Sequence, residues 1–108
     1  MKTGDILLVP FPYSELTNKK VRPAVTISLT KDKYKDIIVA AISSVIPDKI
    51  SENEIIIEPS PKNKLRSKSV IKVDRIVTLK KEDMIAQLGC LTKFELDLFK
   101  TKFRNLIE

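Results

Sequence analysis

Six short apolar runs, separated by segments that contain Pro, Asn, Asp, Ser and Lys, constrain most strongly what this chain can fold into. In residues 21–29 apolar side chains alternate with small or polar ones, and this period of two is typical of a half-buried strand. Arg22 and Ala24 then share the less apolar side of that strand. We therefore expect short strands over 4–11, 21–29, 37–44, 54–59, 69–79 and 85–91.

The end of the chain carries the signature of a helix. Thr92 and Glu95 form a T-x-x-E capping box, and Leu91 and Leu96 are placed as its hydrophobic staple. Apolar residues then recur at helical spacing and should pack on the sheet, namely Leu96, Phe99, Phe103 and Leu106. We expect a brief turn at 80–84, and a loop or one helical turn at 45–53.

These elements predict a mainly β fold, a small β-barrel or strongly bent sheet with one C-terminal helix packed on it. The length of 108 residues fits one domain over 1–108. Strands this short leave a sheet edge or an apolar face exposed, and we expect a homodimer to bury it.

The charge is strongly positive. Lys and Arg total 20 against 14 acidic residues, which gives a net charge of +6. One segment concentrates this charge, with Asp74 among six basic residues, Lys62, Lys64, Arg66, Lys68, Lys72 and Arg75. Such clustering favours a nucleic acid or an acidic protein as partner, although a lysine-rich surface can also serve solubility alone.

The chain contains no histidine and one cysteine, which excludes several kinds of chemistry. A zinc site lacks its usual ligands, and a Cys90 nucleophile lacks the usual activating base, so we expect Cys90 to be a small buried hydrophobe. We expect no metal and no cofactor. A lone cysteine, the lack of a signal-peptide pattern and the lack of an apolar run of about 20 residues predict a cytoplasmic protein.

Three stretches place polar groups on apolar strands. Arg22 precedes Pro23, which has no N–H and is confined to strand edges, starts or bulges, so Arg22 should stand at a rim with its planar guanidinium available to phosphate. Ser43 and Ser44 could bind a phosphate oxygen or could simply end a strand. Lys72 and Asp74, two residues apart, could divide charge stabilisation and proton transfer, or could form an ordinary ion pair.

Five stretches, "GDILLVPFP", "KVRPAVTIS", "VAAISS", "LRSKSVIKVDRIVTL" and "IAQLGCLTKFEL", together resemble the MazF/PemK (Kid) family of toxins from bacterial toxin–antitoxin modules. The resemblance covers nearly the whole chain. It implies a homodimeric SH3-like barrel with a C-terminal helix. It also implies a metal-independent, sequence-selective endoribonuclease that cuts single-stranded RNA (an mRNA interferase), restrained by an antitoxin with an acidic or partly disordered segment.

By the same resemblance, Arg22 of R-P-A is a catalytic residue, and the threonine of the family's I-T-S motif is replaced by Ser43. An arginine and an aspartate of the PemK branch fall on Lys72 and Asp74, so the cation is kept without its bidentate fork. The histidine that this branch carries in its first loop is missing here.

The mechanism we expect is attack of a ribose 2′-OH on the neighbouring phosphorus. Arg22 stabilises the phosphorane, Ser43 holds a non-bridging oxygen, Asp74 is the candidate base, and Lys72 acts beside it. RNA contacts are expected from Ser44, Lys19, Lys20, Lys64, Arg66, Lys68 and Arg75, and the cleavage motif should depend on loops 12–20 and 60–68.

Two other functions fit parts of the pattern. One is a non-catalytic toxin that binds gyrase, because the CcdB family resembles this fold. The other is a plain RNA- or DNA-binding barrel, against which the low aromatic content of 6% and the lack of tryptophan count.

Overall fold

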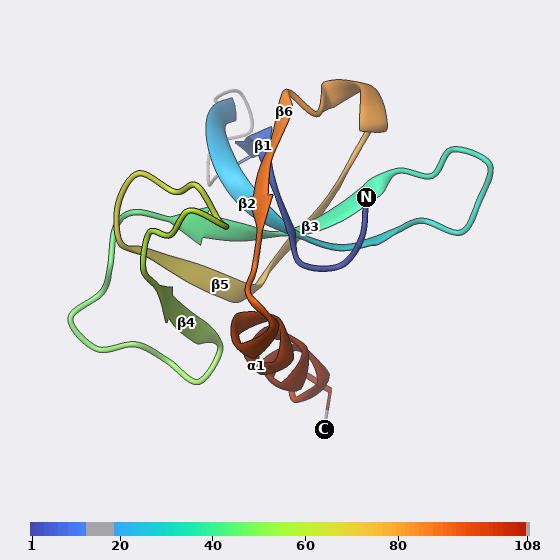
Figure 1. Ribbon diagram of the computed structural model, residues 1–108. Helices are drawn as coiled ribbons and strands as arrows, with labels where there is room; N and C mark the ends of the chain where they lie inside the picture. Colours follow the sequence, from blue (N-terminus) through green and yellow to red (C-terminus); the bar gives the residue numbers. More distant parts are fainter. Residues whose placement is uncertain (13–18, 108) are drawn as a thin grey trace.

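The computed structural model describes residues 1–12 and 19–107, and over these ranges it contains one six-stranded antiparallel sheet and a C-terminal helix (Figure 1). The elements are β1 (Asp5–Pro12), β2 (Lys19–Leu29), β3 (Ile37–Ser43), β4 (Glu54–Ile57), β5 (Ser69–Leu79), the 3₁₀ turn η1 (Lys81–Asp83), β6 (Ala86–Cys90) and α1 (Lys93–Arg104). The strand order is β4-β5-β3-β2-β1-β6. The prediction of a mainly β fold, a small barrel or strongly bent sheet with a C-terminal helix packed on it, is confirmed, and the sheet is a curled half-barrel.

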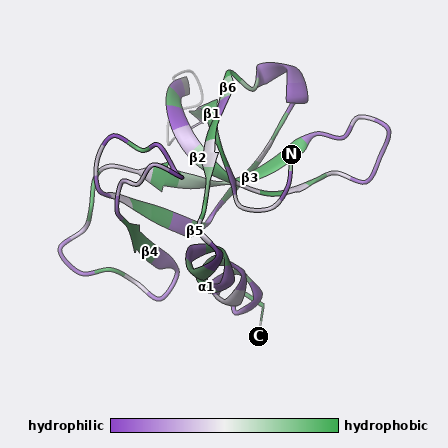
Figure 2. Cartoon of the chain, viewed as in Figure 1, coloured by the Kyte–Doolittle hydropathy of each residue, from purple (hydrophilic) through white to green (hydrophobic). Residues whose placement is uncertain are grey.

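Each of the six expected strands is present, and most differences lie at their ends. β2 begins at Lys19, two residues earlier than expected, and β4 ends at Ile57, before Pro59 and Pro61. Residues 45–53 form a loop without a helical turn, whereas the turn at 80–84 contains η1. Figure 2 shows hydrophobic residues along the middle parts of the strands and hydrophilic residues along many of the loops.

Both faces of the sheet are apolar in its middle, which corrects the expectation that β2 is half buried. Ala24, Val25 and Thr26 are all fully buried although neighbours along a strand point to opposite faces. The sheet curls around one of its faces, and α1 covers the other face. Ala24, which the alternation placed on the less apolar side of β2, and Thr26 are therefore core residues.

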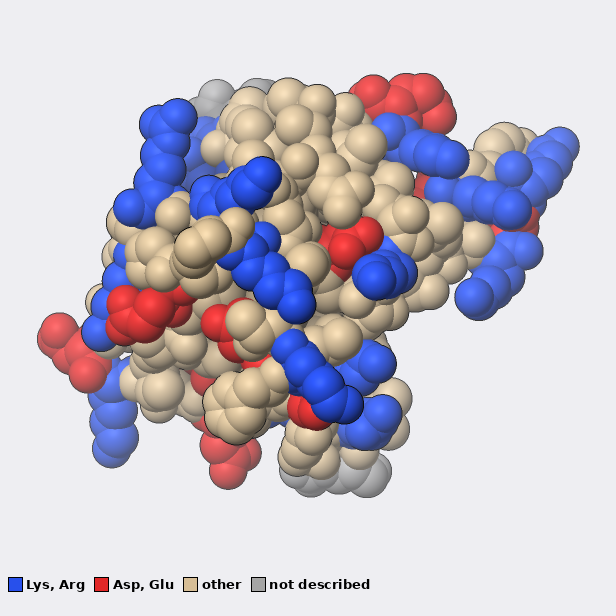
Figure 3. All heavy atoms as spheres, viewed as in Figure 1, with Lys and Arg blue, Asp and Glu red and all other residues tan. Residues whose placement is uncertain are grey.

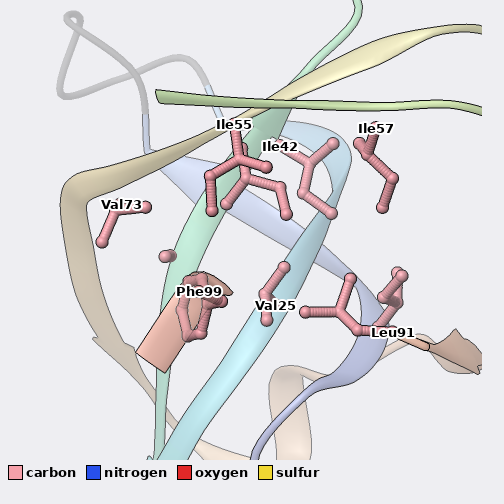
Figure 4. Packing of buried hydrophobic residues seen from close by; sticks show 10 residues of the cluster. Val25, Ile42, Ile55, Ile57, Val73, Leu91 and Phe99 are labelled. Carbon is pink, nitrogen blue, oxygen red and sulfur yellow. The ribbon is translucent and has the colours of Figure 1, made fainter. Parts of the chain in front are cut away.

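The first apolar cluster joins α1 to the sheet. Phe99 of α1 is fully buried and packs with strand residues that include Val25, Ile42 and Ile55 (Figure 4). Leu96, Phe103 and Leu106 are partly buried against the same cluster, as expected from their helical spacing. The second cluster lies on the other face and consists of Leu7, Val9, Phe11, Ala24, Ile37, Val39, Ala41 and Leu79.

The start of α1 is fixed by the capping box that the sequence predicts. The Glu95 N–H donates to Thr92 Oγ1 at 3.2 Å, and the Thr92 N–H donates to Glu95 Oε1 at 2.8 Å. Such a box satisfies two backbone donors that a helix would otherwise leave unpaired. The helix therefore begins directly after β6, with Leu91 buried in the first cluster.

Two smaller expectations have different outcomes. Cys90 is half buried with a free thiol, so the expectation of a buried hydrophobe is only partly right. Within the described ranges, no helix has the length and hydropathy of a transmembrane segment.

Candidate functional site

A row of paired residues crosses four neighbouring strands. Glu54 pairs with Lys72, Lys72 with Ala41, and Ala41 with Ala24. Directly paired residues of antiparallel strands point to the same face of the sheet. The two alanines are buried in the second cluster, so the Lys72–Glu54 end of the row stands at the border of that cluster.

Arg22 and Ser43 belong to the next row on the same face. The ladder between β2 and β3 ends at the Ala24–Ala41 pair, and Arg22 and Ser43 each lie two residues beyond it. Residues two apart on a strand point the same way, so both side chains share the face that carries Lys72. The register thus brings Arg22, Ser43 and Lys72 to one face of three neighbouring strands, with Ser43 the last residue of β3 and Arg22 and Lys72 three residues inside β2 and β5.

Pro23 explains why this ladder stops where it does. β2 lies between β1 and β3, so Pro23 is in a central strand and not on an edge strand. Pro23 pairs with Leu8 of β1, but the pairing with β3 begins only at Ala24. Proline cannot donate to a ladder, and it sits where the ladder with β3 has ended. Arg22 therefore lies beyond the end of the β2–β3 ladder, as expected for a rim position, but it still pairs with Val9 of β1 on the other side of β2.

Arg22 and Ser43 each form a hydrogen bond with the backbone near the end of the β2–β3 ladder. Arg22 is half buried, and its Nη1 donates to the Val21 carbonyl at 3.1 Å. Ser43 Oγ accepts the Val45 N–H at 3.1 Å, so the serine does end its strand. A hydroxyl that accepts this bond keeps its own proton available to a further acceptor.

Lys72 forms an ion pair with Glu54, a residue that the sequence analysis did not identify. Lys72 Nζ lies 2.8 Å from Glu54 Oε2, and the Ser51 N–H donates to Glu54 Oε1 at 2.8 Å. The hydrogen bond from Lys72, followed by that from Ser51, lowers the pKa of Glu54 below its ordinary value. The pairing of Lys72 with Asp74 that the sequence suggested is wrong. Only the register of β4 with β5 identifies Glu54 as the partner.

Asp74 lies in a bulge of β5. Ala41 pairs with Lys72 but Ala40 pairs with Ile76, so residues 73–75 are extra on the β5 side. A bulge interrupts the alternation from which a common face for Lys72 and Asp74 was inferred. Asp74 is exposed and accepts a hydrogen bond of 3.4 Å from Asn53 Nδ2.

A hollow of about 540 Å³ at the same end of the sheet collects four predicted site residues, Arg22, Ser44, Lys64 and Arg66. Its apolar lining consists of Leu8, Val21, Pro23, Ile42, Leu65 and Leu88, and Ser67 and Ser69 complete it. The hollow therefore combines cations and hydroxyls with apolar walls.

The remaining predicted contacts lie outside this hollow. Lys20 and Arg75 are exposed on β2 and in the β5 bulge, and Lys68 forms an exposed pair with Glu58 at 3.7 Å. The side chain of Lys19, like residues 13–18 of the first loop, lies outside the described part of the chain. Figure 3 shows Lys and Arg spread over the face of the molecule turned to the viewer, with acidic side chains between them and not as one continuous patch.

The sequence analysis missed two residues that fix the basic loop 60–68: Asn63 within the loop, and Gly89 of β6, the strand on which the loop rests. Asn63 is fully buried and hydrogen-bonded within the loop, and Gly89 touches the Lys62 carbonyl. An asparagine in a polar loop gives no sequence signal of burial. In residues 1–12 and 19–107, no three Cys, Asp or Glu side chains gather in a way that could hold a metal ion.

The fold and this site define a small curled half-barrel with cationic and hydroxyl side chains on one face of three neighbouring strands. The family model described as PemK-like, MazF-like toxin of type II toxin–antitoxin system matches residues 2–107. The chain belongs to this family. No curated protein sequence matches the chain.

Solved structures with a similar fold include three from mycobacteria. An endoribonuclease in complex with its cognate antitoxin, from mycobacterial species, has a TM-score of 0.72 at 15% identity, over 97% of this chain and 92% of that one. The Mycobacterium tuberculosis toxin MazF-mt6 gives 0.68 at 18%, over 94% and 93%. A further mycobacterial endoribonuclease gives 0.69 at 15%, over 97% and 88%. At such identities these matches show that the fold is shared.

Proposed function

We propose that this toxin is a sequence-selective endoribonuclease that cuts single-stranded RNA. The observation that carries the proposal is the placement of Arg22, Ser43 and Lys72 on one face of three neighbouring strands. Ser43 and Lys72 are diagonal neighbours on adjacent strands, which lie roughly 7–8 Å apart, and Arg22 lies on the strand on the other side of β3, so we expect the three side chains to reach one phosphodiester group. Family membership and the endoribonuclease neighbours support the same reading.

The reaction is an internal transfer at phosphorus. The ribose 2′-OH attacks the adjacent phosphorus, the P–O5′ bond breaks, and the products carry a 2′,3′-cyclic phosphate and a 5′-OH. Negative charge builds up on the non-bridging oxygens in the transition state. The Arg22 guanidinium stabilises this charge, and Ser43 donates its hydroxyl proton to one of these oxygens.

Proton transfer is assigned to an acidic and a basic group of β5. The exposed Asp74 carboxylate is the proposed base for the 2′-OH, and Lys72 contributes positive charge once a phosphate competes with Glu54 for it. Water protonates the leaving oxygen, because a guanidinium group is a poor acid. Ser44, Lys64 and Arg66 bind the flanking RNA at the hollow.

The proposal extends to the partners of the chain. One domain over 1–108 forms a homodimer in the cytoplasm, and an antitoxin with an acidic or disordered segment covers the site. The net charge of +6 supports both an RNA and an acidic protein as partner. The structural neighbour solved with its cognate antitoxin supports the second of these.

The test is cleavage of a long RNA in the presence of EDTA, with the new ends mapped. We expect cuts at a short recurring sequence, with cyclic phosphate ends. Arg22→Ala should lower the rate by on the order of 100-fold or more, because it removes a preorganised charge from the transition state. Arg104→Ala, at the exposed end of α1, is the matched control. An Arg22→Ala variant as fast as wild type would refute the assignment, and gyrase inhibition without RNA cleavage would refute the nuclease.

A further inference from the structure

The connection between β4 and β5 reaches across the molecule to the opposite edge of the sheet. β4 and β6 are the two edge strands of the order β4-β5-β3-β2-β1-β6. The Cys90 N–H of β6 nevertheless donates to the Lys62 carbonyl of this connection at 3.1 Å. The connection thus bridges the two edges of the curled sheet, and it covers a backbone donor of an edge strand.

Asn63 gives this connection a fixed shape. Its side chain is fully buried, and its Oδ1 accepts the Ser60 N–H at 3.0 Å and the Leu65 N–H at 2.9 Å. Its Nδ2 donates to the Glu58 carbonyl at 2.8 Å. Lys64 takes a left-handed backbone conformation with φ of 57°. A buried amide that uses both its donor and its acceptor specifies one loop conformation.

Gly89 gives the connection a fixed place on β6. A Cβ at Gly89 would lie 2.1 Å from the Lys62 carbonyl oxygen and 3.1 Å from that of Asn63. Carbon and oxygen that are not bonded do not approach to 2.1 Å, and the obstacle is backbone, so any other residue would push the loop away. Gly89 and Asn63 together dock the loop on β6, and we call this pair the clamp.

The clamp decides where two cations stand. Lys64 and Arg66 lie one and three residues after Asn63, and both line the hollow that Arg22 also lines. Without the clamp, residues 58–68 would be a basic, Pro- and Ser-containing loop with little reason to hold these charges near β2. Ordering such a loop only when RNA binds would cost conformational entropy and weaken binding.

We propose that Asn63 and Gly89 are positioning residues, which hold Lys64 and Arg66 beside Arg22 so that the RNA groove is preformed. This rests on the proposed function, because it names what builds the RNA-binding side of that same site. The two residues act through the loop backbone and do not themselves contact RNA. They should therefore affect how tightly RNA binds and not how fast bound RNA is cut.

The first test compares Asn63→Ala and Gly89→Ala with wild type in RNA cleavage. We expect KM to rise on the order of tenfold, which corresponds to about 1.4 kcal/mol, with kcat within about twofold. Loss of two phosphate contacts should lower the slope of log affinity against log salt by about 1.4. Asn105→Ala and Gln87→Ala change exposed residues and serve as matched controls. A fall in kcat with KM unchanged would overturn the proposal.

The second test asks whether the clamp acts through the two cations. Lys64→Asn with Arg66→Ser removes both charges, and asparagine tolerates the left-handed conformation at 64. In that background Asn63→Ala should weaken RNA binding no further, whereas an additive loss would overturn the proposal. Binding is measured with a 2′-O-methyl RNA that cannot be cleaved.

A third measurement separates this proposal from the proposed nuclease and from simple unfolding. Amide hydrogen exchange should show faster exchange at Cys90 in both clamp variants, with the amides of β2 and β3 still protected. Faster exchange with unchanged RNA affinity would refute the positioning role and leave the nuclease standing. A wild type that binds RNA without cutting it would refute the nuclease and leave the affinity comparison valid.

Discussion

Glu54→Gln is the substitution that most directly tests whether Glu54 of β4 restrains Lys72 of β5 through their ion pair. Glu54 holds Lys72 in an ion pair at the border of the second cluster. As long as this pair persists, the positive charge of Lys72 is largely neutralised. Glutamine keeps the size of the side chain and an oxygen acceptor for the Ser51 N–H, but it removes the negative charge.

The expected loss of stability follows from the exposure of the pair. The Lys72 and Glu54 side chains are 24% and 11% exposed, and their charged atoms are 2.8 Å apart. Exposed pairs contribute about 0–1 kcal/mol, and removal of one partner of a fully buried pair costs about 3–5 kcal/mol. A pair between these limits should cost about 2 kcal/mol. Urea unfolding followed by circular dichroism measures this as a lower midpoint with an unchanged slope.

The same substitution should strengthen RNA binding. Release of Lys72 lets it neutralise one more phosphate, which steepens the salt dependence by about 0.7 for single-stranded RNA. Between 200 and 50 mM salt the affinity should then rise by an extra factor of about 2.6 compared with wild type. Fluorescence anisotropy with a 2′-O-methyl RNA gives both values.

Glu58→Gln is the matched control, because it also removes one negative charge that faces a lysine. The Lys68–Glu58 pair is 3.7 Å long, and its side chains are 55% and 68% exposed. Its loss should change stability by less than about 1 kcal/mol. If Glu54→Gln loses no more stability than Glu58→Gln and binds RNA with the salt dependence of wild type, Glu54 does not restrain Lys72 and the argument fails.

Two further outcomes concern acid stability and the helix. The pKa of Glu54 is lowered in the folded state, so its contribution to stability is complete above the ordinary value of 4.5 and is lost as the pH falls through the folded value. The stability difference between wild type and Glu54→Gln should therefore close in acid unfolding below about pH 4.5; a constant difference down to pH 2 would contradict it. Phe99→Ala should cost about 3–5 kcal/mol because Phe99 is fully buried in the first cluster, as measured by urea unfolding. The same change at Phe94, 78% exposed on the same helix, should cost far less, and equal losses would contradict the role of Phe99.

The sequence predicts the elements of this fold well because local signals mark them. Turn residues bound the six strands, and the capping box of Thr92 and Glu95 fixes the start of α1. The expectation of a solvent side on β2 fails for a physical reason. Ala24 and Thr26 are small or polar, but the curl of the sheet buries both faces, and a curl is not visible in the alternation of one strand.

The parts of the site that escaped prediction depend on contacts between distant segments. Glu54 meets Lys72 only because β4 pairs with β5 in one register, and the bulge at 73–75 shows only in the pairing with β3. Gly89 would have suggested a close approach of backbone, which is a general reason for glycine in a strand. The approaching segment, at Lys62, is 27 residues away by its number and follows β4, the strand at the other edge of the sheet.

The apolar core and the proposed active site depend on the same register. Arg22 and Ser43 share a face with Lys72 because Ala24 pairs with Ala41 and Ala41 with Lys72. A slip of β3 by one residue would move Ser43 to the other face and expose the core side chain Ile42 beside Arg22. It would also move Ala41 out of the second cluster and break both apolar layers at once. The packing that stabilises the sheet therefore also keeps Ser43 on the same face as Arg22. A core residue such as Ala41 thus helps to determine the geometry of the proposed active site without contacting RNA.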